Sequence, residues 1–259
     1  MMGYDVLHLG IAALAGLACG FFNAVASSGS VVSLPTLMWM GLHAIDANAT
    51  NRIPVLIGGI TATIELARNG KIPWKLAWQT SIPVTLGSAC GAGLAEMIPS
   101  HDLRIFITAA VLAALVLILT KLKDVINAAA AGTTRYGLRE KSLFFLVGIW
   151  LGFIVLDGAT YLLLVLVLAV RLPLIEANAI KNFLSVPTTI VAMVIFASRG
   201  SVDWTLGGIL GIGSIAGSYL GARLALSENA KQWIMRLLIF VIVGELLHLG
   251  IRYYLRVLG

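Results

Sequence analysis

Charged residues are scarce in this chain, and that scarcity excludes most classes of protein. Asp, Glu, Lys and Arg make up 12% of the 259 residues, whereas a soluble domain is about 25% charged. So few charged groups cannot cover the surface of a water-soluble globule. The same composition excludes an intrinsically disordered chain, which combines low hydrophobicity with high net charge.

Cysteine pairs and the signatures of enzymes are lacking as well. Cys19 and Cys90 both lie in apolar stretches, so we interpret them as packing residues and expect neither a disulfide nor a metal site. The histidines show no metal-ligand spacing. A Walker loop, a dinucleotide fingerprint, an HExxH motif and a serine nucleophile elbow are all missing. We therefore expect no enzyme activity and no cofactor, and a primary pump would need a partner subunit.

Long apolar runs dominate what is present. Hydrophobic residues make up 59% of the chain, and the mean hydropathy is +0.96. A spanning helix needs about 20 apolar residues, so the composition predicts an all-α integral membrane protein. Apolar runs and breakers place the helical segments at 6–26, 31–42, 47–67, 74–97 and 102–121, then 142–157, 159–170, 174–197, 204–226 and 230–251. Segment 31–42 is too short to cross upright, and the short segments 31–42 and 159–170 either span the membrane or re-enter it.

The two halves of the chain are repeats. Adding 130 to the residue number aligns 41–95 with 171–225 without a gap, and 18 of the 55 pairs are identical. Asn, Trp and paired Gly-Ser positions match, which shared membrane composition does not explain. Five segments per repeat is an odd number, so the second repeat is expected to be inverted relative to the first. We divide the chain into a first repeat (1–121), a cytoplasmic connecting loop (122–141) and a second repeat (142–259).

The distribution of positive charge sets the expected orientation. The net charge is +6, and in a membrane protein this excess marks cytoplasmic loops better than it marks a nucleic-acid site. With residues 121–141 in the cytoplasm, 13 of the 18 Lys and Arg residues face inward. Positively charged residues are enriched in the cytoplasmic loops of membrane proteins. This positive-inside rule favours both termini outside the cytoplasm, and we expect a multi-pass protein of the inner membrane.

Small polar residues interrupt the apolar runs once in each half. In the first half they are Asn23, Ser27, Ser28, Gly29 and Ser30. Irregular backbone at membrane depth is tolerated only inside protein or beside a water-filled cavity, and free N–H groups at the next helix start attract anions. An ordinary surface loop is the alternative.

The equivalent break in the second half contains an acid. Asp157 lies in a very apolar setting and is followed by Gly158, Ala159 and Thr160. An intramembrane acid is a candidate carrier of a proton or cation. Asp157 as the N-cap of the next helix explains it equally well.

A second pair of motifs supplies amides and cations. Asn48, Asn51 and Arg52 precede a long apolar run, as do Asn178, Lys181 and Asn182 in the second half. A cation inside a membrane needs a partner or a bound anion. Arg can grip an oxyanion with two parallel N–H bonds, whereas Lys acts as a point charge. Convergence of both cations would form a cage for an anion; snorkelling to the interface is the alternative.

These elements, in this order and in two copies, resemble the TauE/SafE sulfite exporter (TSUP) family. The resemblance rests on the break at 23–30 with Pro35, on the Ala-Thr-Asn-Arg element at 49–52, on the Gly70-to-Trp74 turn, and on the matching motifs at 179–182, 200–204 and 217–223. It covers nearly the whole chain. It implies secondary transport of a sulfur-containing anion such as sulfite, thiosulfate or an organosulfonate, with no ATPase of its own. Where the family commonly carries lysine, this chain has Arg52.

The expected function is therefore a secondary transporter whose halves alternate around an anion site at the midplane. The expected partners are a small anionic substrate, the lipid bilayer and a coupling proton or sodium ion, with no nucleic acid. The alternatives are a passive anion channel, a transporter of a small carboxylate, and a non-transporting membrane component.

Overall fold

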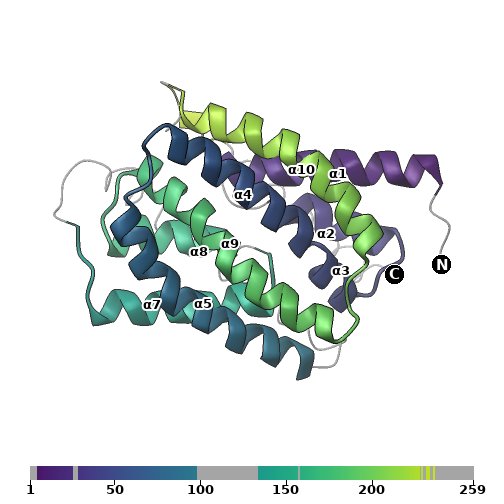
Figure 1. The fold of residues 1–259 in the computed structure, drawn as a ribbon, viewed down its shortest axis with the longest axis horizontal. Helices are drawn as coiled ribbons and strands as arrows, with labels where there is room; N and C mark the ends of the chain where they lie inside the picture. Colours follow the sequence, from purple (N-terminus) through teal and green to yellow (C-terminus); the bar gives the residue numbers. More distant parts are fainter. Residues whose placement is uncertain are drawn as a thin grey trace, which may run out of the picture.

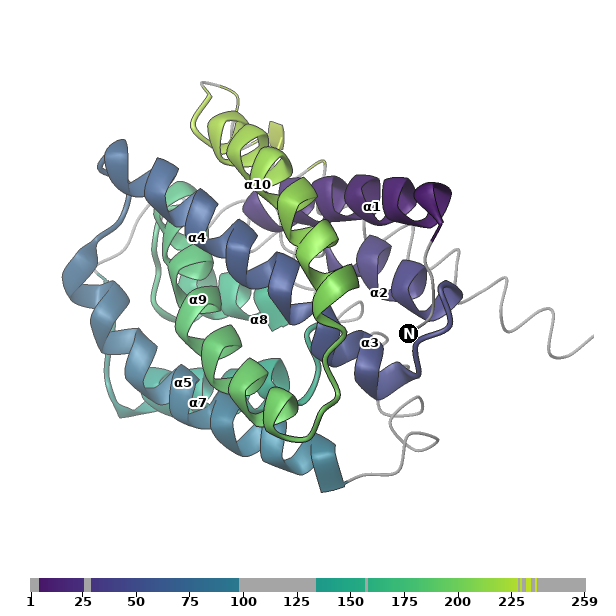
Figure 2. The ribbon, with the colours of Figure 1, turned by 45° about the vertical axis from the view of Figure 1, so that its right-hand side comes forward.

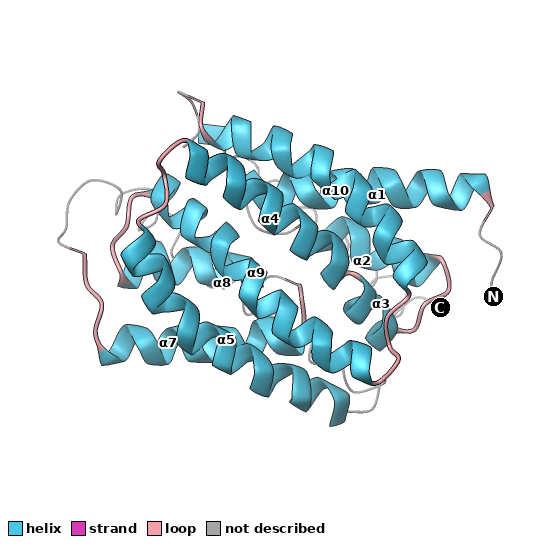
Figure 3. Cartoon of the chain, in the orientation of Figure 1, coloured by secondary structure: helices cyan, strands magenta, loops and turns pink. Residues whose placement is uncertain are grey.

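The computed structural model describes residues 5–25, 29–97, 134–156 and 158–227, together with positions 229, 232, 233 and 236. Throughout these residues the regular structure is helical (Figure 3). The helices are α1 (Val6–Val25), α2 (Ser30–Trp39), α3 (Ala44–Thr50), α4 (Arg52–Arg68), α5 (Trp74–Met97), α7 (Leu138–Phe153), α8 (Gly158–Leu164), the π-helical η1 (Val165–Ala169), α9 (Leu174–Ser198) and α10 (Trp204–Ala225). The expected segments 102–121 and 230–251 lie outside the described residues, apart from isolated positions in the second.

Helix pairs from opposite halves form the two edges of the molecule. α1 packs along α10 at one edge and α5 packs along α7 at the other, with α4 and α9 between them (Figure 1). α10 also packs on α4, and α5 packs on α9. α4 and α9 also lie in the middle of the molecule when it is viewed from a second direction (Figure 2). Among the described helices, α1, α9 and α10 are long and apolar enough to cross a membrane.

Glycines let the edge helices approach closely. A Cβ atom at Gly217 would lie 1.9 Å from the carbonyl oxygen of Leu17, and one at Gly91 would lie 1.9 Å from that of Ile149. Backbones this close need residues without side chains, which is the geometry of small-xxx-small helix pairs. Gly87 and Gly91 have this four-residue spacing in the sequence, as do Gly217 and Gly221.

The expected segment 47–67 is wrong in one respect, because it forms two helices that meet at Asn51. α3 ends at Thr50, and α4 begins at Arg52. Pro54 lies in the first turn of α4, where a proline is tolerated but clashes with a helical carbonyl four residues earlier. The equivalent position in the second half is Leu184, and there α9 runs unbroken.

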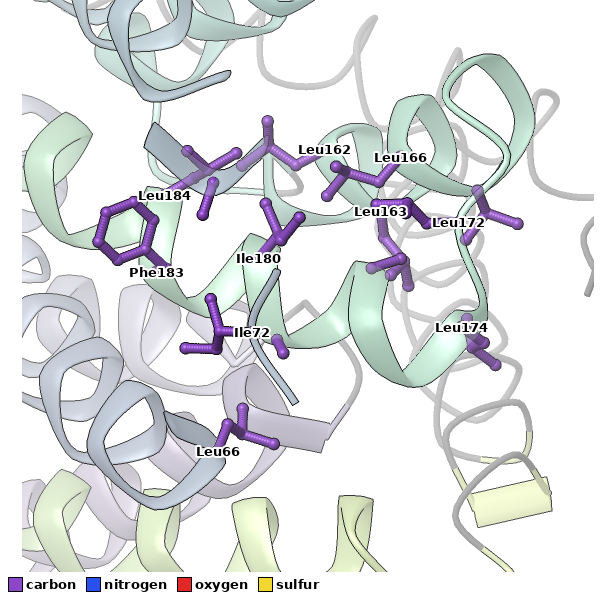
Figure 4. Packing of buried hydrophobic residues seen from close by; sticks show 14 of the residues in the cluster. Leu66, Ile72, Leu162, Leu163, Leu166, Leu172, Leu174, Ile180, Phe183 and Leu184 are labelled. Carbon is purple, nitrogen blue, oxygen red and sulfur yellow. The ribbon is translucent and has the colours of Figure 1, made fainter. Parts of the chain in front are cut away.

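Apolar side chains, many of them leucine, fill the interior between the helices. Leu162 and Leu166 pack toward Ile180 and Leu184 of α9, and all four are fully buried (Figure 4). This cluster fixes α8 and η1 against α9. α7 begins at Leu138, inside the range 122–141 expected as a loop. The division into inverted repeats stays a prediction.

Candidate functional site

The break between α1 and α2 and the break between α7 and α8 leave two helix ends inside the molecule. The last four carbonyl groups of a helix have no partner within the helix. At the end of α7, the backbone N–H of Ile154 donates a hydrogen bond to the carbonyl oxygen of Trp150. The carbonyls of Leu151, Gly152 and Phe153 therefore need donors from elsewhere.

Arg52 and Asn48 supply these donors from the other half of the chain. Arg52 donates from Nη1 to Leu151 O at 3.1 Å and from Nη2 to Gly152 O at 2.6 Å. Asn48 Nδ2 donates to Phe153 O at 3.2 Å. The guanidinium also lies 4.8 Å from the ring centre of Phe196. A cation at a helix C-terminus is also favoured by the helix dipole.

The second half does the same for the end of α1. Lys181 Nζ donates to Asn23 O at 2.6 Å. Asn178 Nδ2 and Asn182 Nδ2 both donate to Ala24 O, at 2.9 and 3.2 Å. Each half of the chain thus holds the broken helix end of the other half, and we call this arrangement the crossed contacts.

Both cations are buried and reach one cavity. Arg52 and Lys181 are each 1% exposed, so the snorkelling alternative is wrong for both. The cavity has a volume of about 20 Å³, and a water molecule needs about 10–15 Å³ measured in this way. The cavity is lined by Asn23, Ser30, Arg52, Val55, Gly59, Leu151, Val155, Ala159, Lys181, Asn182, Ser185, Thr188 and Thr189.

The lining differs between the two central helices. α9 contributes hydroxyl groups through Ser185, Thr188 and Thr189, whereas α4 contributes Val55 and Gly59. These residues were not among those predicted from the sequence. Thr188 and Thr189 follow Ser185 at three and four residues, which is the spacing of one helix face. This spacing could have identified the three hydroxyl groups as neighbours.

Of the residues predicted for the site, five line the cavity: Asn23, Ser30, Arg52, Lys181 and Asn182. Asn48 and Asn178 lie outside the lining and hold the helix ends instead. Ser27, Ser28 and Asp157 lie outside the described residues.

Gly29, Asn51 and Thr160 are also absent from the lining. Free N–H groups were expected at the start of α2 as anion donors. The backbone N–H of Gly29 instead donates to Asn23 Oδ1 at 2.9 Å. Asn51 is fully buried, and its amide has no hydrogen-bond partner among the described residues. Thr160 is buried in α8. The described residues contain no group of His, Cys, Asp and Glu side chains that could hold a metal ion.

Comparison with known proteins gives a consistent result. The model of the family described as sulfite exporter TauE/SafE matches residues 12–246. A probable membrane transporter protein, ORF9, from Sinorhizobium is 24% identical over 84% of this chain and 83% of its own length. The probable membrane transporter protein YfcA from Escherichia coli K12 is 27% identical over 87% and 83%.

A probable membrane transporter protein from Haemophilus influenzae is 27% identical over 88% of both chains. No solved structure matches this chain significantly. A family match over most of the chain agrees with the apolar helices of the structure. The chain therefore belongs to the TauE/SafE sulfite exporter family of membrane transporters.

Proposed function

We propose that this protein is a secondary transporter of a sulfur-containing anion, and that the cavity between Arg52 and Lys181 is its substrate site. One observation carries the proposal: a buried cation from each half lines the same cavity, although the two residues are more than a hundred positions apart in the chain. Buried cations at membrane depth are costly and therefore mark functional sites. The family name supplies the class of anion.

The anion oxygens would take over hydrogen bonds that now go to backbone carbonyls. Arg52 would present two parallel N–H groups and Lys181 a point charge. The hydroxyl groups of Ser185 and Thr188 now donate to Asn182 O and Leu184 O, at 2.7 Å each. Rotation of these hydroxyls would add neutral donors to the site.

Binding of the anion is coupled to a conformational change. The cavity has room for about one water molecule, which is less than an oxyanion with three oxygen atoms needs. When an anion withdraws Arg52 and Lys181 from the crossed contacts, the helix ends that join the halves are released. The halves then rock relative to each other, which is alternating access. The inverted repeats, the orientation and the coupling ion are part of this proposal.

Counterflow of [³⁵S]sulfite in proteoliposomes tests the proposal. A transporter preloaded with sulfite transiently accumulates label, whereas an open channel shows no accumulation. Gly59→Ala is the sharpest variant, because its Cβ would lie 2.6 Å from Ser185 Oγ inside the cavity. That hydroxyl can rotate away, so the fold is kept while the cavity narrows. Gly93→Ala is the control, because no atom of the described residues lies within 4 Å of its Cβ.

We expect strong counterflow for the unaltered protein and for Gly93→Ala, and a large loss for Gly59→Ala. Flux without counterflow would favour the channel, and counterflow of a small carboxylate but not of sulfite would favour the carboxylate transporter. No counterflow with sulfite, thiosulfate or a sulfonate would contradict the proposed function. Equal counterflow for both glycine variants would contradict the proposed site.

A further inference from the structure

A second and larger cavity lies on the outside of the helix pair α5 and α7, away from the crossed contacts. Its volume is about 610 Å³. Lys75 and Gln79 of α5 line one end together with Tyr136 and Lys141, and apolar side chains of α5 and α7 line the rest. We call it the α5–α7 groove.

The polar end of this groove is held together by a specific contact. Tyr136 donates its hydroxyl proton to the carbonyl oxygen of Gln79 at 2.7 Å. That carbonyl lacks its usual helical donor, because residue 83 is a proline without an N–H group. Lys141 Nζ lies 5.8 Å from the centre of the Tyr136 ring. The hydrogen bond therefore ties the segment before α7 to α5, and Lys75 and Lys141 line the same groove.

Neither ammonium group is neutralised by a neighbour within the part of the chain that the structure describes. Lys75 and Lys141 are exposed, and no carboxylate in the described ranges forms an ion pair with either. Two cations at one end of a groove favour an anionic ligand.

The rest of the groove is apolar and open. Ile82 is 66% exposed and Leu86 is 59% exposed, and they lie one turn apart on the same face of α5. Phe145 faces them from α7. From Lys75 to Leu86 the helix rises about 16 Å at 1.5 Å per residue. A cationic end followed by this apolar length matches a ligand with an anionic head and a hydrocarbon tail.

We propose that the α5–α7 groove binds an anionic phospholipid. Its phosphate lies between Lys75 and Lys141, and one acyl chain runs along Ile82, Leu86 and Phe145. The predicted orientation places both lysines on the cytoplasmic side, where the leaflet carries anionic lipids and basic pockets between helices bind their headgroups. The proposal stands independently of what the protein transports.

Native mass spectrometry of the purified full-length protein tests this inference. The protein is titrated with phosphatidylglycerol and, separately, with phosphatidylcholine of the same acyl chains. We expect saturable adducts with phosphatidylglycerol at lower lipid concentration than with phosphatidylcholine. The double variant Lys75→Gln/Lys141→Gln should lose this preference, with phosphatidylglycerol affinity falling roughly tenfold or more. Lys71→Gln is the matched control, because Lys71 is exposed but absent from the groove.

Two further arms separate a lipid from other occupants. Excess glycerol phosphate should leave the adduct intact, because it lacks the acyl chain, and its displacing the lipid would overturn the assignment to a phospholipid. Leu86→Cys, made on a Cys90→Ser background because Cys90 of α5 is exposed, should react with a lipid-soluble maleimide in the lipid-free protein and should be protected by phosphatidylglycerol. Protection of this cysteine without any lipid adduct would mean that the protein itself fills the groove, and it would overturn the proposal. Equal lipid preference in the double variant and in Lys71→Gln would also overturn the proposal.

Discussion

Gly41 and Arg171 occupy the same place in the two halves of the chain, and both adopt a left-handed backbone, with φ of 99° and 66°. Each lies in the connection that follows a short helix, and the two residues are 130 positions apart. Glycine adopts this conformation freely, whereas a residue with a Cβ is strained there by about 1–2 kcal/mol. The second half therefore carries backbone strain that the first half avoids.

This difference predicts opposite effects of two substitutions. Arg171→Gly should raise the free energy of unfolding by up to about 1 kcal/mol, since relief of strain exceeds the added entropy of the unfolded chain. Gly41→Ala should lower it by about 1 kcal/mol. Apparent melting temperatures in detergent check both. Arg199→Gly is the control, because φ is −97° there, and a gain equal to that of Arg171→Gly would contradict the strain.

Close packing of the edge helices predicts a sharp contrast between neighbouring glycines of α5. Gly91→Ala would place its Cβ 1.9 Å from Ile149 O, so the helices must separate. Overpacking of this kind costs about 1–3 kcal/mol or more. The Cβ of Gly93→Ala meets no atom within 4 Å in the described part of the chain, and this variant should stabilise α5 by up to about 1 kcal/mol. Thermal unfolding of the two variants measures the contrast, and similar melting temperatures would rule out contact at Gly91.

Asn48 holds the end of α7 by two hydrogen bonds. Its Nδ2 donates to Phe153 O, and its Oδ1 accepts the backbone N–H of Val155 at 2.9 Å. Asn48→Ala should cost roughly 2–4 kcal/mol, because two buried backbone groups lose their partners. Asn48→Asp keeps the acceptor and loses the donor.

The unaltered protein should have a higher melting temperature than either Asn48 variant. Both variants should also transport sulfite more slowly, because the end of α7 carries cavity residues. Unchanged stability in Asn48→Ala would contradict the crossed contacts at this end.

The ion pair between Glu65 and Arg223 should contribute little to the free energy of unfolding. Arg223 Nε lies 3.4 Å from Glu65 Oε1, and the arginine side chain is 64% exposed. Exposed ion pairs contribute about 0–1 kcal/mol and are screened by salt. Arg223→Gln should therefore shift the melting temperature by only a few degrees at low salt and less at high salt. A large loss that persists in high salt would show that Arg223 acts by packing on Tyr219, whose ring centre is 4.9 Å from the guanidinium.

Much of the helical layout could be predicted from apolar runs and from the 130-residue repeat. The segment 74–97 is reproduced by α5, and the ends of α1, α9 and α10 lie within one residue of those expected. Hydrophobic length and breakers are local properties, so the sequence carries them directly. The break at Asn51 was missed, although Pro54 in the first half and Leu184 in the second already marked the difference.

The partners of the candidate site could not be predicted in the same way. The sequence indicated that Arg52 and Lys181 belong together, because the repeat aligns their motifs. It did not indicate that each cation would bind the helix end of the opposite half, since that depends on how α4 and α9 cross the broken helices. The hydroxyl groups of Ser185 and Thr188 could not be predicted as site groups, because Ser and Thr within a helix commonly donate to a carbonyl three or four residues earlier, as both do here.

In the proposed transport cycle Arg52 and Lys181 hold one anion between them, and the stabilisation of the purified protein by sulfite tests this most directly. A ligand that binds the folded state raises the melting temperature. Lys181→Gln is the informative variant, with Lys71→Gln as a control of equal charge. We predict that sulfite raises the melting temperature of the unaltered protein and of Lys71→Gln, but not that of Lys181→Gln. An equal, saturable rise in Lys181→Gln would contradict the central claim.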